Sequence, residues 1–328
     1  MPLRFIVALL GFAGVASGDE PRLNQIQVIG THNSYHIAPT TDVLGLIAAA
    51  GKGRAEGLDY SHRPLAEQFD RGIRQVELDI FADPAGGHYA DPSARKVLKG
   101  MGKDPGPDVD ARFREPGLKV FHVQDVDYRS TAPTFVDALT QIRAWSLAHP
   151  RHVPILVLVE AKDEPIPTLP TRPVPFDRAA LDAIDAEILS VFDRSRILAP
   201  DDVRGPSETL LDALRSRGWP MLESCRGKVM FALDNEGKLR DLYLDGHPAL
   251  RGRLLFVSVP RSNPAAAWMK RNDPVGDFDD IQALVRDGFL VRTRADADTK
   301  QSRTNNGTQR DKALASGAQF VSTDYPEP

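Results

Sequence analysis

The stretch Val76-Glu77-Leu78-Asp79-Ile80 alternates aliphatic and acidic side chains with a period of two residues. In an extended strand this spacing places Glu77 and Asp79 on one face, while the three aliphatic residues point to the other. A strand with a branched aliphatic face packs that face against a core. The sequence therefore predicts a buried strand that carries two carboxylates side by side.

This stretch is the second of eight short runs of apolar or β-branched residues. Helical patterns separate several of the runs, as between Thr134 and Ala148 and at Leu181, Ile184 and Ile188. Strands and helices that alternate eight times predict an α/β fold, a (β/α)8 TIM-type barrel in a distorted form. The runs are 26–29, 76–80, 118–123, 155–159, 229–233, 254–259, 289–291 and 320–323.

Polar side chains stand at the ends of nearly all these runs. Thr31-His32-Asn33-Ser34 follows the first run, His122 ends the third, and Glu160-Ala161-Lys162 ends the fourth. Barrel enzymes carry their chemistry on the loops that leave the C-terminal ends of the strands. We therefore expect these residues at one mouth of the barrel. Long loops at 83–116 and 165–175 are expected to cover that mouth.

The first 18 residues have the pattern of a secretory signal peptide. Arg4 precedes an apolar run from Phe5 to Ala16, which is too short to span a bilayer, and small residues follow it. We expect a secreted or periplasmic protein whose residues 19–328 form a single catalytic domain. A net charge of -4 argues against a nucleic-acid partner.

Four oxygen-bearing residues at the strand ends suggest a metal site. Asn33, Glu77, Asp79 and Glu160 offer one amide oxygen and three carboxylates, which suit calcium or magnesium better than zinc. Any one of these acids alone would more often form a salt bridge to an arginine. Their convergence at neighbouring strand ends favours the metal site.

Two of the eight histidines stand beside this acidic group. His32 and His122 follow the first and third runs, whereas His36 and the other five are interpreted as structural. Two imidazoles can divide proton transfer, one accepting a proton from a nucleophile and the other giving one to a leaving oxygen. Together with a divalent cation they predict cleavage of a phosphodiester.

Several motifs in this order resemble the X-region of phosphoinositide-specific phospholipases C. Four carry the general likeness: residues 30–35, 76–79, 121–122 and 159–160. Four more resemble the bacterial calcium-dependent branch of that family: residues 226–228, 232–234, 293–299 and 321–325. The resemblance implies a distorted barrel that binds one calcium ion, Ca2+, and acts on phosphatidylinositol.

The resemblance also implies a role for each site residue. The inositol 2-hydroxyl would attack phosphorus, releasing diacylglycerol and inositol 1,2-cyclic phosphate, which water can open to inositol 1-phosphate. His32 would stabilise the pentacoordinate phosphorus, and His122 would protonate the leaving glycerol oxygen. The implied calcium ligands are Asn33, Glu77, Asp79 and Glu160, with Glu77 or Glu160 also acting as the base. The implied substrate contacts are Lys162, Arg292 and Arg294, unless these form salt bridges to Asp296 or Asp298.

Two other functions compete with this one. A glycerophosphodiester phosphodiesterase combines similar residues, but typically has His-Arg where this chain has His32-Asn33. A module that binds inositol lipids without turnover would have little use for two proton carriers.

The substrate is either an inositol phospholipid or a soluble inositol phosphodiester, and we expect a monomer. Trp268 is expected to pack under a short helix or, alternatively, to make transient contact with a membrane surface.

Overall fold

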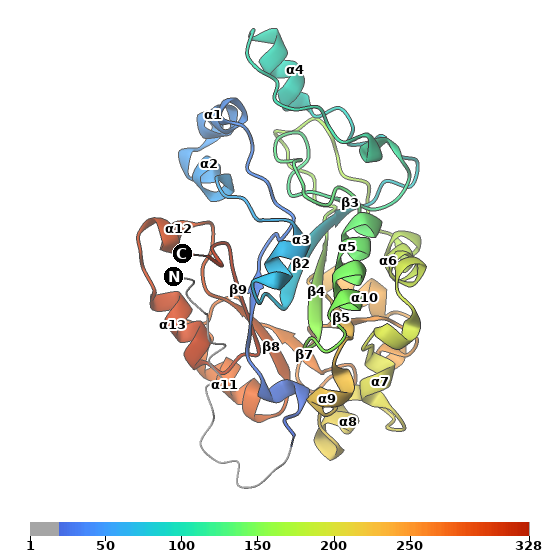
Figure 1. Cartoon of the computed structure of the whole chain (residues 1–328). Coiled ribbons are helices and arrows are strands. Elements are labelled where there is room, and N and C mark those ends of the chain that lie inside the picture. The colour runs from blue at the N-terminus through green and yellow to red at the C-terminus, as the bar shows by residue number, and fades with distance from the viewer. Residues whose placement is uncertain (1–19, 328) are drawn as a thin grey trace.

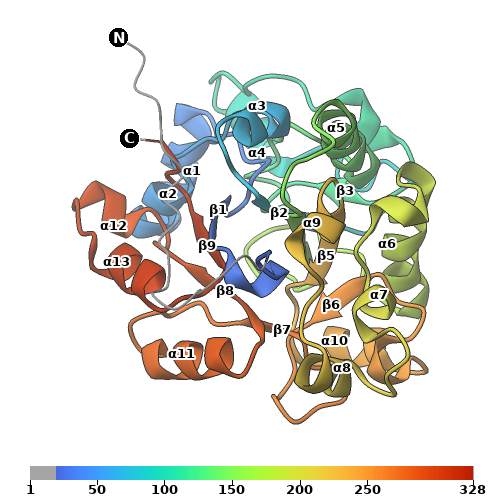
Figure 2. The same cartoon turned by 60° about the horizontal axis from the view of Figure 1, so that its bottom comes forward.

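The chain folds into a barrel of eight parallel strands, which confirms the fold predicted from the sequence. The computed structural model describes residues 20–327, and the strands form a ring surrounded by helices (Figures 1 and 2). The strands of the ring are β1 (Val28–Thr31), β2 (Gln75–Phe81), β4 (Ile155–Ala161), β5 (Val229–Leu233), β6 (Leu255–Val257), β7 (Trp268–Lys270), β8 (Leu290–Arg294) and β9 (Phe320–Thr323).

These strands follow one another around the ring in chain order. β1 pairs with both β2 and β9, and the ladder runs from β2 through β4 and β5 to β6 on one side and from β9 through β8 to β7 on the other. A parallel bridge between Ser258 and Trp268 joins β6 to β7. In this register Asp79 of β2 stands opposite Glu160 of β4. The C-terminal ends of the strands therefore meet at one mouth.

One predicted barrel strand, residues 118–123, is wrong. Lys119 and Val120 form a two-residue strand, β3, which pairs antiparallel with β2 and lies outside the ring. Its apolar residues are nevertheless buried: Leu118 and Val120 belong to the main core, whereas Phe121 stacks on Phe81 with ring centroids 3.9 Å apart in a small aromatic cluster. An apolar run indicates burial but does not show whether the strand belongs to the ring.

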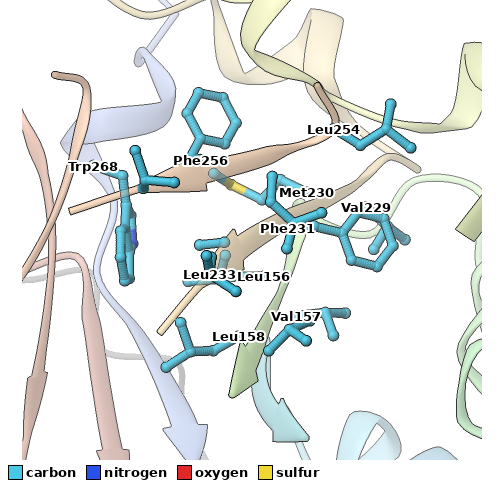
Figure 3. Packing of buried hydrophobic residues seen from close by; sticks show 14 of the residues in the cluster. Leu156, Val157, Leu158, Val229, Met230, Phe231, Leu233, Leu254, Phe256 and Trp268 are labelled. Atoms are coloured by element: carbon cyan, nitrogen blue, oxygen red, sulfur yellow. The ribbon is translucent and has the colours of Figure 1, made fainter. Parts of the chain in front are cut away.

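The barrel strand that the sequence did not predict is β7. Its three residues are too few to show a period of two, so no pattern marked it. Trp268 begins this strand and is fully buried in the main core, to which Phe256 of β6 also belongs (Figure 3). The expected burial of Trp268 is therefore confirmed, although the residue lies on a barrel strand, and the alternative of contact with a membrane is wrong.

The main core fills the barrel and the layer between strands and helices. Residues 155–159 and 229–233 are fully buried on both faces, as expected of parallel strands covered by helices. Figure 3 shows part of this core, with Leu156 and Leu158 on β4 and Met230 and Leu233 on β5. Burial of this size holds the strand ends, and hence the mouth, in fixed positions.

Helices cover the outside of the barrel. α5 begins after Thr134, whose hydroxyl accepts a hydrogen bond from the Asp137 amide at 3.1 Å, and α6 begins after Asp177, whose carboxylate accepts one from the Ala180 amide at 2.9 Å. The outer helices are α3 (Leu65–Asp70), α5 (Phe135–Ala148), α6 (Arg178–Val191), α7 (Pro200–Arg204), α8 (Leu210–Ser216), α9 (Leu222–Cys225), α10 (Gly237–Leu244), α11 (Phe278–Arg286) and α13 (Thr308–Ala315).

Four more helices lie in loops that leave the C-terminal ends of strands. They are α1 (Thr41–Ala50), α2 (Lys52–Leu58), α4 (Ser93–Gly100) and α12 (Lys300–Arg303). The loop at 83–116 is thus partly helical, because it contains α4. Helices α1, α2 and α4 lie beyond the strand ends at the top of Figure 1. Within residues 20–327 no helix is long and apolar enough to cross a membrane.

Gly30 of β1 provides a test of how tightly the ring is closed. A Cβ atom at this position would lie 2.7 Å from the Cβ of Gln75 on β2, and that atom cannot move without the backbone. We expect Gly30→Ala to lower the free energy of unfolding by about 1–3 kcal/mol, measured by urea denaturation. Gly53→Ala is the control, because nothing lies within 4 Å of its Cβ position. Equal stability of the two variants would contradict the close approach of β1 and β2.

Candidate active site

The loop after β1 carries the first two site residues. Asn33 has a φ of +47°, in the left-handed region that asparagine tolerates better than most residues. The amide of Ser34 donates to the carbonyl of Glu77 at 3.0 Å, and the Ser34 hydroxyl accepts from the Glu77 amide at 2.8 Å. These two bonds fix His32 and Asn33 beside β2.

The three acids expected to bind a metal converge at the mouth. Glu77, Asp79 and Glu160 each offer a carboxylate oxygen, and the three oxygens lie within 4.8 Å of one another. Glu77 and Asp79 are buried, while Glu160 is partly exposed. The side-chain oxygen of Asn33 and both oxygens of Asp79 are buried without a hydrogen-bond partner. Such atoms need either a proton or a cation.

Burial raises the pKa of both acids on β2. For Glu77, the Arg292 guanidinium opposes this rise, whereas the carboxylates of Asp234 and Asp79 add to it. For Asp79, the Lys162 ammonium opposes the rise and Glu160 adds to it. The free energy cost of ionising two buried acids together is large, and a divalent cation would remove it. The residues present therefore fit a hard cation with oxygen ligands.

His32 is held by a buried carboxylate from the other end of the chain. Its Nδ1 lies 2.7 Å from Asp324 Oδ1, and its Nε2 lies 3.5 Å from Glu77 Oε1. A proton on Nδ1 makes the bond to Asp324 and leaves Nε2 as the acceptor nitrogen. Burial lowers the pKa of His32 well below its usual range, and Arg294 and Arg292 lower it further. The imidazole is therefore neutral at pH 7.

His122 is held by a second buried carboxylate, which it shares with His36. Its Nδ1 lies 2.9 Å from Asp127 Oδ2, and His36 Nε2 lies 2.8 Å from the same oxygen. Although burial opposes it, the two imidazoles keep the pKa of Asp127 below its usual range. The carboxylate thus fixes the ring of His122 and leaves Nε2 as the nitrogen that can exchange a proton with a substrate.

The three cationic side chains expected to contact substrate all lie in the mouth, each paired with an acid. Lys162 Nζ lies 3.4 Å from Asp79 and 3.2 Å from Glu160. Arg292 is 1% exposed, and its guanidinium donates to Glu77 Oε2 at 2.5 Å. We therefore assign Arg292 to positioning Glu77.

Arg294 is the third cation, and its side chain is 14% exposed. Its Nη2 lies 3.7 Å from Asp324 and 3.3 Å from His32 Nδ1. Its Nε donates to the backbone carbonyl of Asp296 at 3.1 Å. The predicted salt bridges to the side chains of Asp296 and Asp298 are not found for Lys162, Arg292 or Arg294 within residues 20–327.

A cleft of about 480 Å³ extends from this group toward α10. His122, Glu160 and Lys162 line its inner part, and Asn235 and Lys238 line the side toward α10. Asn235 is fixed by two hydrogen bonds to the backbone of Ala161, of 2.7 and 2.9 Å. The cleft gives a substrate access to His122 and to Glu160 of the acidic group.

The sequence did not identify three residues that hold the histidines. Asp324 follows the last predicted run, so its strand-end position was a usable signal, but nothing in the pattern paired it with His32. Asp127 pairs with Val123 in an isolated bridge that closes the turn after β3, and it gives no periodic signal. His36 was interpreted as structural; it is buried, but its bond to Asp127 connects it to His122.

Comparisons with known proteins show the family and the fold. A family model described as Ca2+-dependent phosphoinositide phospholipase C matches residues 21–328. Curated proteins gave no significant sequence match.

Among solved structures, a calcium-dependent phosphoinositol-specific phospholipase C from a Gram-negative Pseudomonas species is similar, with a TM-score of 0.56 and 13% identity over 92% of this chain and 90% of that chain. The structure described as its myo-inositol complex gives the same values. A calcium-dependent phosphatidylinositol-specific phospholipase C from Streptomyces antibioticus has a TM-score of 0.54 and 19% identity over 91% of this chain and 93% of that chain. At these identities the likeness shows a shared fold.

The shared carboxylate gives a prediction for His122. In Asp127→Asn the side chain is neutral and no longer favours a protonated imidazole, so we expect turnover to fall on the order of 10²-fold and the pH profile to shift. The measurement is the initial rate of diester cleavage against pH, at matched folded fraction. Asp185→Asn on α6, which loses bonds to Tyr243 and Arg253 away from the mouth, is the control. An unchanged pH profile would show that Asp127 does not act through His122.

The buried acids give a prediction for stability against pH. Because the pKa values of Glu77 and Asp79 are raised, the folded cation-free protein keeps protons that the unfolded chain releases above about pH 4. The stability that these two acids contribute is therefore lost as the pH rises from about 4 to about 8. A bound cation competes with these protons, so the gain in Tm on adding calcium increases with pH.

The measurement is differential scanning calorimetry at about pH 5.5 and about pH 8, with a chelator and with calcium. The variant Glu77→Gln/Asp79→Asn is the control, because it removes both groups, and its gain in Tm should be small at either pH. An equal gain at both pH values in the unaltered protein would contradict the cation site.

Proposed function

Because the chain belongs to the calcium-dependent phosphoinositide phospholipase C family, we propose that it cleaves phosphatidylinositol, or a related inositol phosphodiester, to diacylglycerol and an inositol phosphate. The family identifies it as a phosphodiesterase of the phospholipase C type. The observation that carries the proposal is the pair of His–Asp contacts, His32 with Asp324 and His122 with Asp127, on either side of a buried acidic group.

His122 supplies the proton for the leaving group in this proposal. Its Nδ1–H is donated to Asp127, so the ring keeps one orientation and Nε2 carries the transferable proton. Asp127 stabilises the positive charge of the protonated ring, and His36 holds Asp127 from the opposite side. The leaving oxygen is that of the glycerol moiety, which the cleft beside His122 can accommodate.

His32 accepts the proton from the attacking inositol hydroxyl in this proposal. A lowered pKa favours the neutral imidazole, and the bond from Nδ1 to Asp324 turns the lone pair of Nε2 toward the mouth. This role differs from the stabilisation of phosphorus that the family resemblance implied. Glu77 and Glu160, the bases that the family resemblance implied, would both hold the calcium ion, and Glu77 Oε2 is also bound to the Arg292 guanidinium, so neither carboxylate is free to accept the proton.

Asn33, Glu77, Asp79 and Glu160 would hold the calcium ion on which the family depends. When bound, calcium supplies positive charge that stabilises the negative charge on the phosphate and lowers the pKa of a nearby hydroxyl. Asn33 Nδ2 donates a hydrogen bond to the Tyr60 hydroxyl at 3.1 Å. This bond turns the Asn33 side-chain oxygen away from Tyr60 and leaves it free to bind the ion.

Lys162 and Arg294 are the proposed contacts to phosphate or inositol hydroxyls. Both are partly exposed in the mouth, in contrast to buried Arg292. Lys162 can exchange part of its carboxylate pairing for a phosphate oxygen at little cost, because Asp79 and Glu160 would then face the calcium ion. Arg294 lies 3.7 Å from Asp324, so it also has donors left for a phosphate oxygen.

We also propose that the product is at first inositol 1,2-cyclic phosphate and that the protein is exported. The predicted signal peptide, residues 1–18, lies outside the described residues.

Phosphorus NMR of the products tests this function directly. With calcium present we expect phosphatidylinositol to give the signal of a five-membered cyclic phosphate, and with a chelator we expect no turnover. His122→Ala should slow the reaction on the order of 10²-fold or more. His149→Ala, a half-exposed histidine that follows α5, is the matched control and should behave like the unaltered protein.

Two outcomes would contradict the proposal. Faster cleavage of glycerophosphocholine than of phosphatidylinositol would assign the chain to glycerophosphodiester cleavage instead. Measurable affinity for inositol phosphate in calcium, with no turnover of any diester, would make the chain a binding module.

A further inference from the structure

Residues 59–62 bring the chain back to the mouth of the barrel from the rim helices α1 and α2 (Figure 1). We call these four residues the return segment. Its Tyr60 and His62 are each 7% exposed, although the segment contains no helix or strand. Polar groups that are buried in an irregular segment need partners. Both side chains find their partners in the loop after β1, which carries His32 and Asn33.

Tyr60 contacts the proposed calcium ligand of that loop. Its hydroxyl accepts a hydrogen bond from Asn33 Nδ2 at 3.1 Å. Because Nδ2 is engaged, the Asn33 oxygen is the atom left for a cation, and this oxygen is buried without a hydrogen-bond partner. The Tyr60 ring packs on the His36 ring with centroids 4.5 Å apart, which holds the hydroxyl in place. Tyr60 thus decides which end of the Asn33 amide is available to the ion.

His62 contacts the backbone of the same loop. Its Nε2 donates to the carbonyl of His32 at 2.8 Å, and its amide donates to the carbonyl of His36 at 2.9 Å. The amide of His32 donates in turn to the carbonyl of Thr323 at 3.2 Å. Both backbone polar groups of His32 are therefore bonded. They fix the point from which its imidazole reaches Asp324.

The return segment is itself anchored to the far side of the mouth. Arg303 of α12 donates to the carbonyls of Glu56 and Asp59, in both cases at 3.0 Å. The Thr299 hydroxyl, at the start of α12, donates to the Glu56 carbonyl at 2.9 Å. The loop after β1 is thus held on one side by β2 and on the other by a segment fixed to the loop after β8.

We propose that Tyr60 and His62 are positioning residues that serve two different parts of the site. Tyr60 directs the Asn33 oxygen to the calcium ion and so sets calcium affinity. His62 fixes the backbone of His32 and so sets the rate of proton transfer. The inference rests on the proposed function, which assigns calcium to Asn33 and proton transfer to His32. Partners that orient a metal ligand or a base, without touching substrate, act in this way.

Calorimetric titration with calcium tests Tyr60 without any substrate. Tyr60→Phe keeps the ring that packs on His36 and removes only the hydroxyl, so we expect the calcium Kd to rise on the order of tenfold. The gain in Tm on adding calcium should shrink with it. Turnover lost in this variant should be recovered by raising calcium.

Tyr325→Phe is the matched control for the titration. The Tyr325 ring lies beside that of Tyr60, with centroids 6.4 Å apart, but its hydroxyl forms no hydrogen bond within residues 20–327. The calcium Kd of this variant should equal that of the unaltered protein. An equal Kd for Tyr60→Phe and Tyr325→Phe would overturn the role of Tyr60.

Turnover of phosphatidylinositol at saturating calcium tests His62. We expect His62→Leu to lower the rate on the order of tenfold or more, because a small displacement of His32 impairs proton transfer, while the calcium Kd stays within about twofold. His62→Gln retains an N–H donor of similar reach and should recover most of the lost rate. His247→Leu is the control, because His247 Nδ1 also donates to a backbone carbonyl, that of Arg251 at 2.8 Å, but between α10 and β6.

The outcomes separate this inference from the proposed function. Melting temperatures verify that all variants are folded. A rate for His62→Leu equal to that of His247→Leu, or no recovery in His62→Gln, would overturn the role of His62. Failure of the unaltered protein to cleave phosphatidylinositol would overturn the proposed function and the role of His62 with it. The calcium titration would still decide the role of Tyr60, because it involves no turnover.

Discussion

The whole mouth of this barrel is organised by the need to neutralise acids that one strand buries at the same place. The period of β2 turns Glu77 and Asp79 to one side, and the register with β4 brings Glu160 opposite Asp79. Buried like charges cost so much free energy that the surrounding structure must supply compensation. Arg292 and Lys162 supply part of it. The buried oxygens that still have no partner define where a cation fits.

The same constraint explains the state of the two histidines. The mouth is rich in buried charge of both signs, so an imidazole there keeps a defined proton only if a carboxylate fixes one of its nitrogens. Asp324 does this for His32 and Asp127 does it for His122. The arginines that offset the acids also hold the pKa of His32 down. Acid neutralisation and proton transfer are therefore parts of one electrostatic arrangement.

The rim of the mouth is not constrained by buried charge, because the outer sides of its helices are exposed. The loops after β1 and β2 form α1 and α4, which pack against each other through a small apolar cluster and stand beyond the strand ends. Such a rim can carry apolar and cationic side chains without affecting the core. Its link to the site runs through Asp125, which fixes the start of α4 close to Asp127. Substrate access and chemistry are thus joined by a short stretch of chain.

The sequence by itself determined the α/β barrel and the oxygen-rich group, because both follow from local periods. The spacing of Glu77 and Asp79 and the polar residues after several runs needed no knowledge of distant contacts. Local pattern could not separate a barrel strand from another buried strand beside the ring, so it included residues 118–123 and omitted Trp268–Lys270.

Only the tertiary structure decided which carboxylate holds each histidine and which cation is paired with each acid. Asp324 reaches His32 across 292 residues of chain, and Arg292 reaches Glu77 across 215. Closure of the ring creates these contacts, since it brings the first and last strands together. Pairing across such separations depends on where the backbone goes, and no local period carries that information.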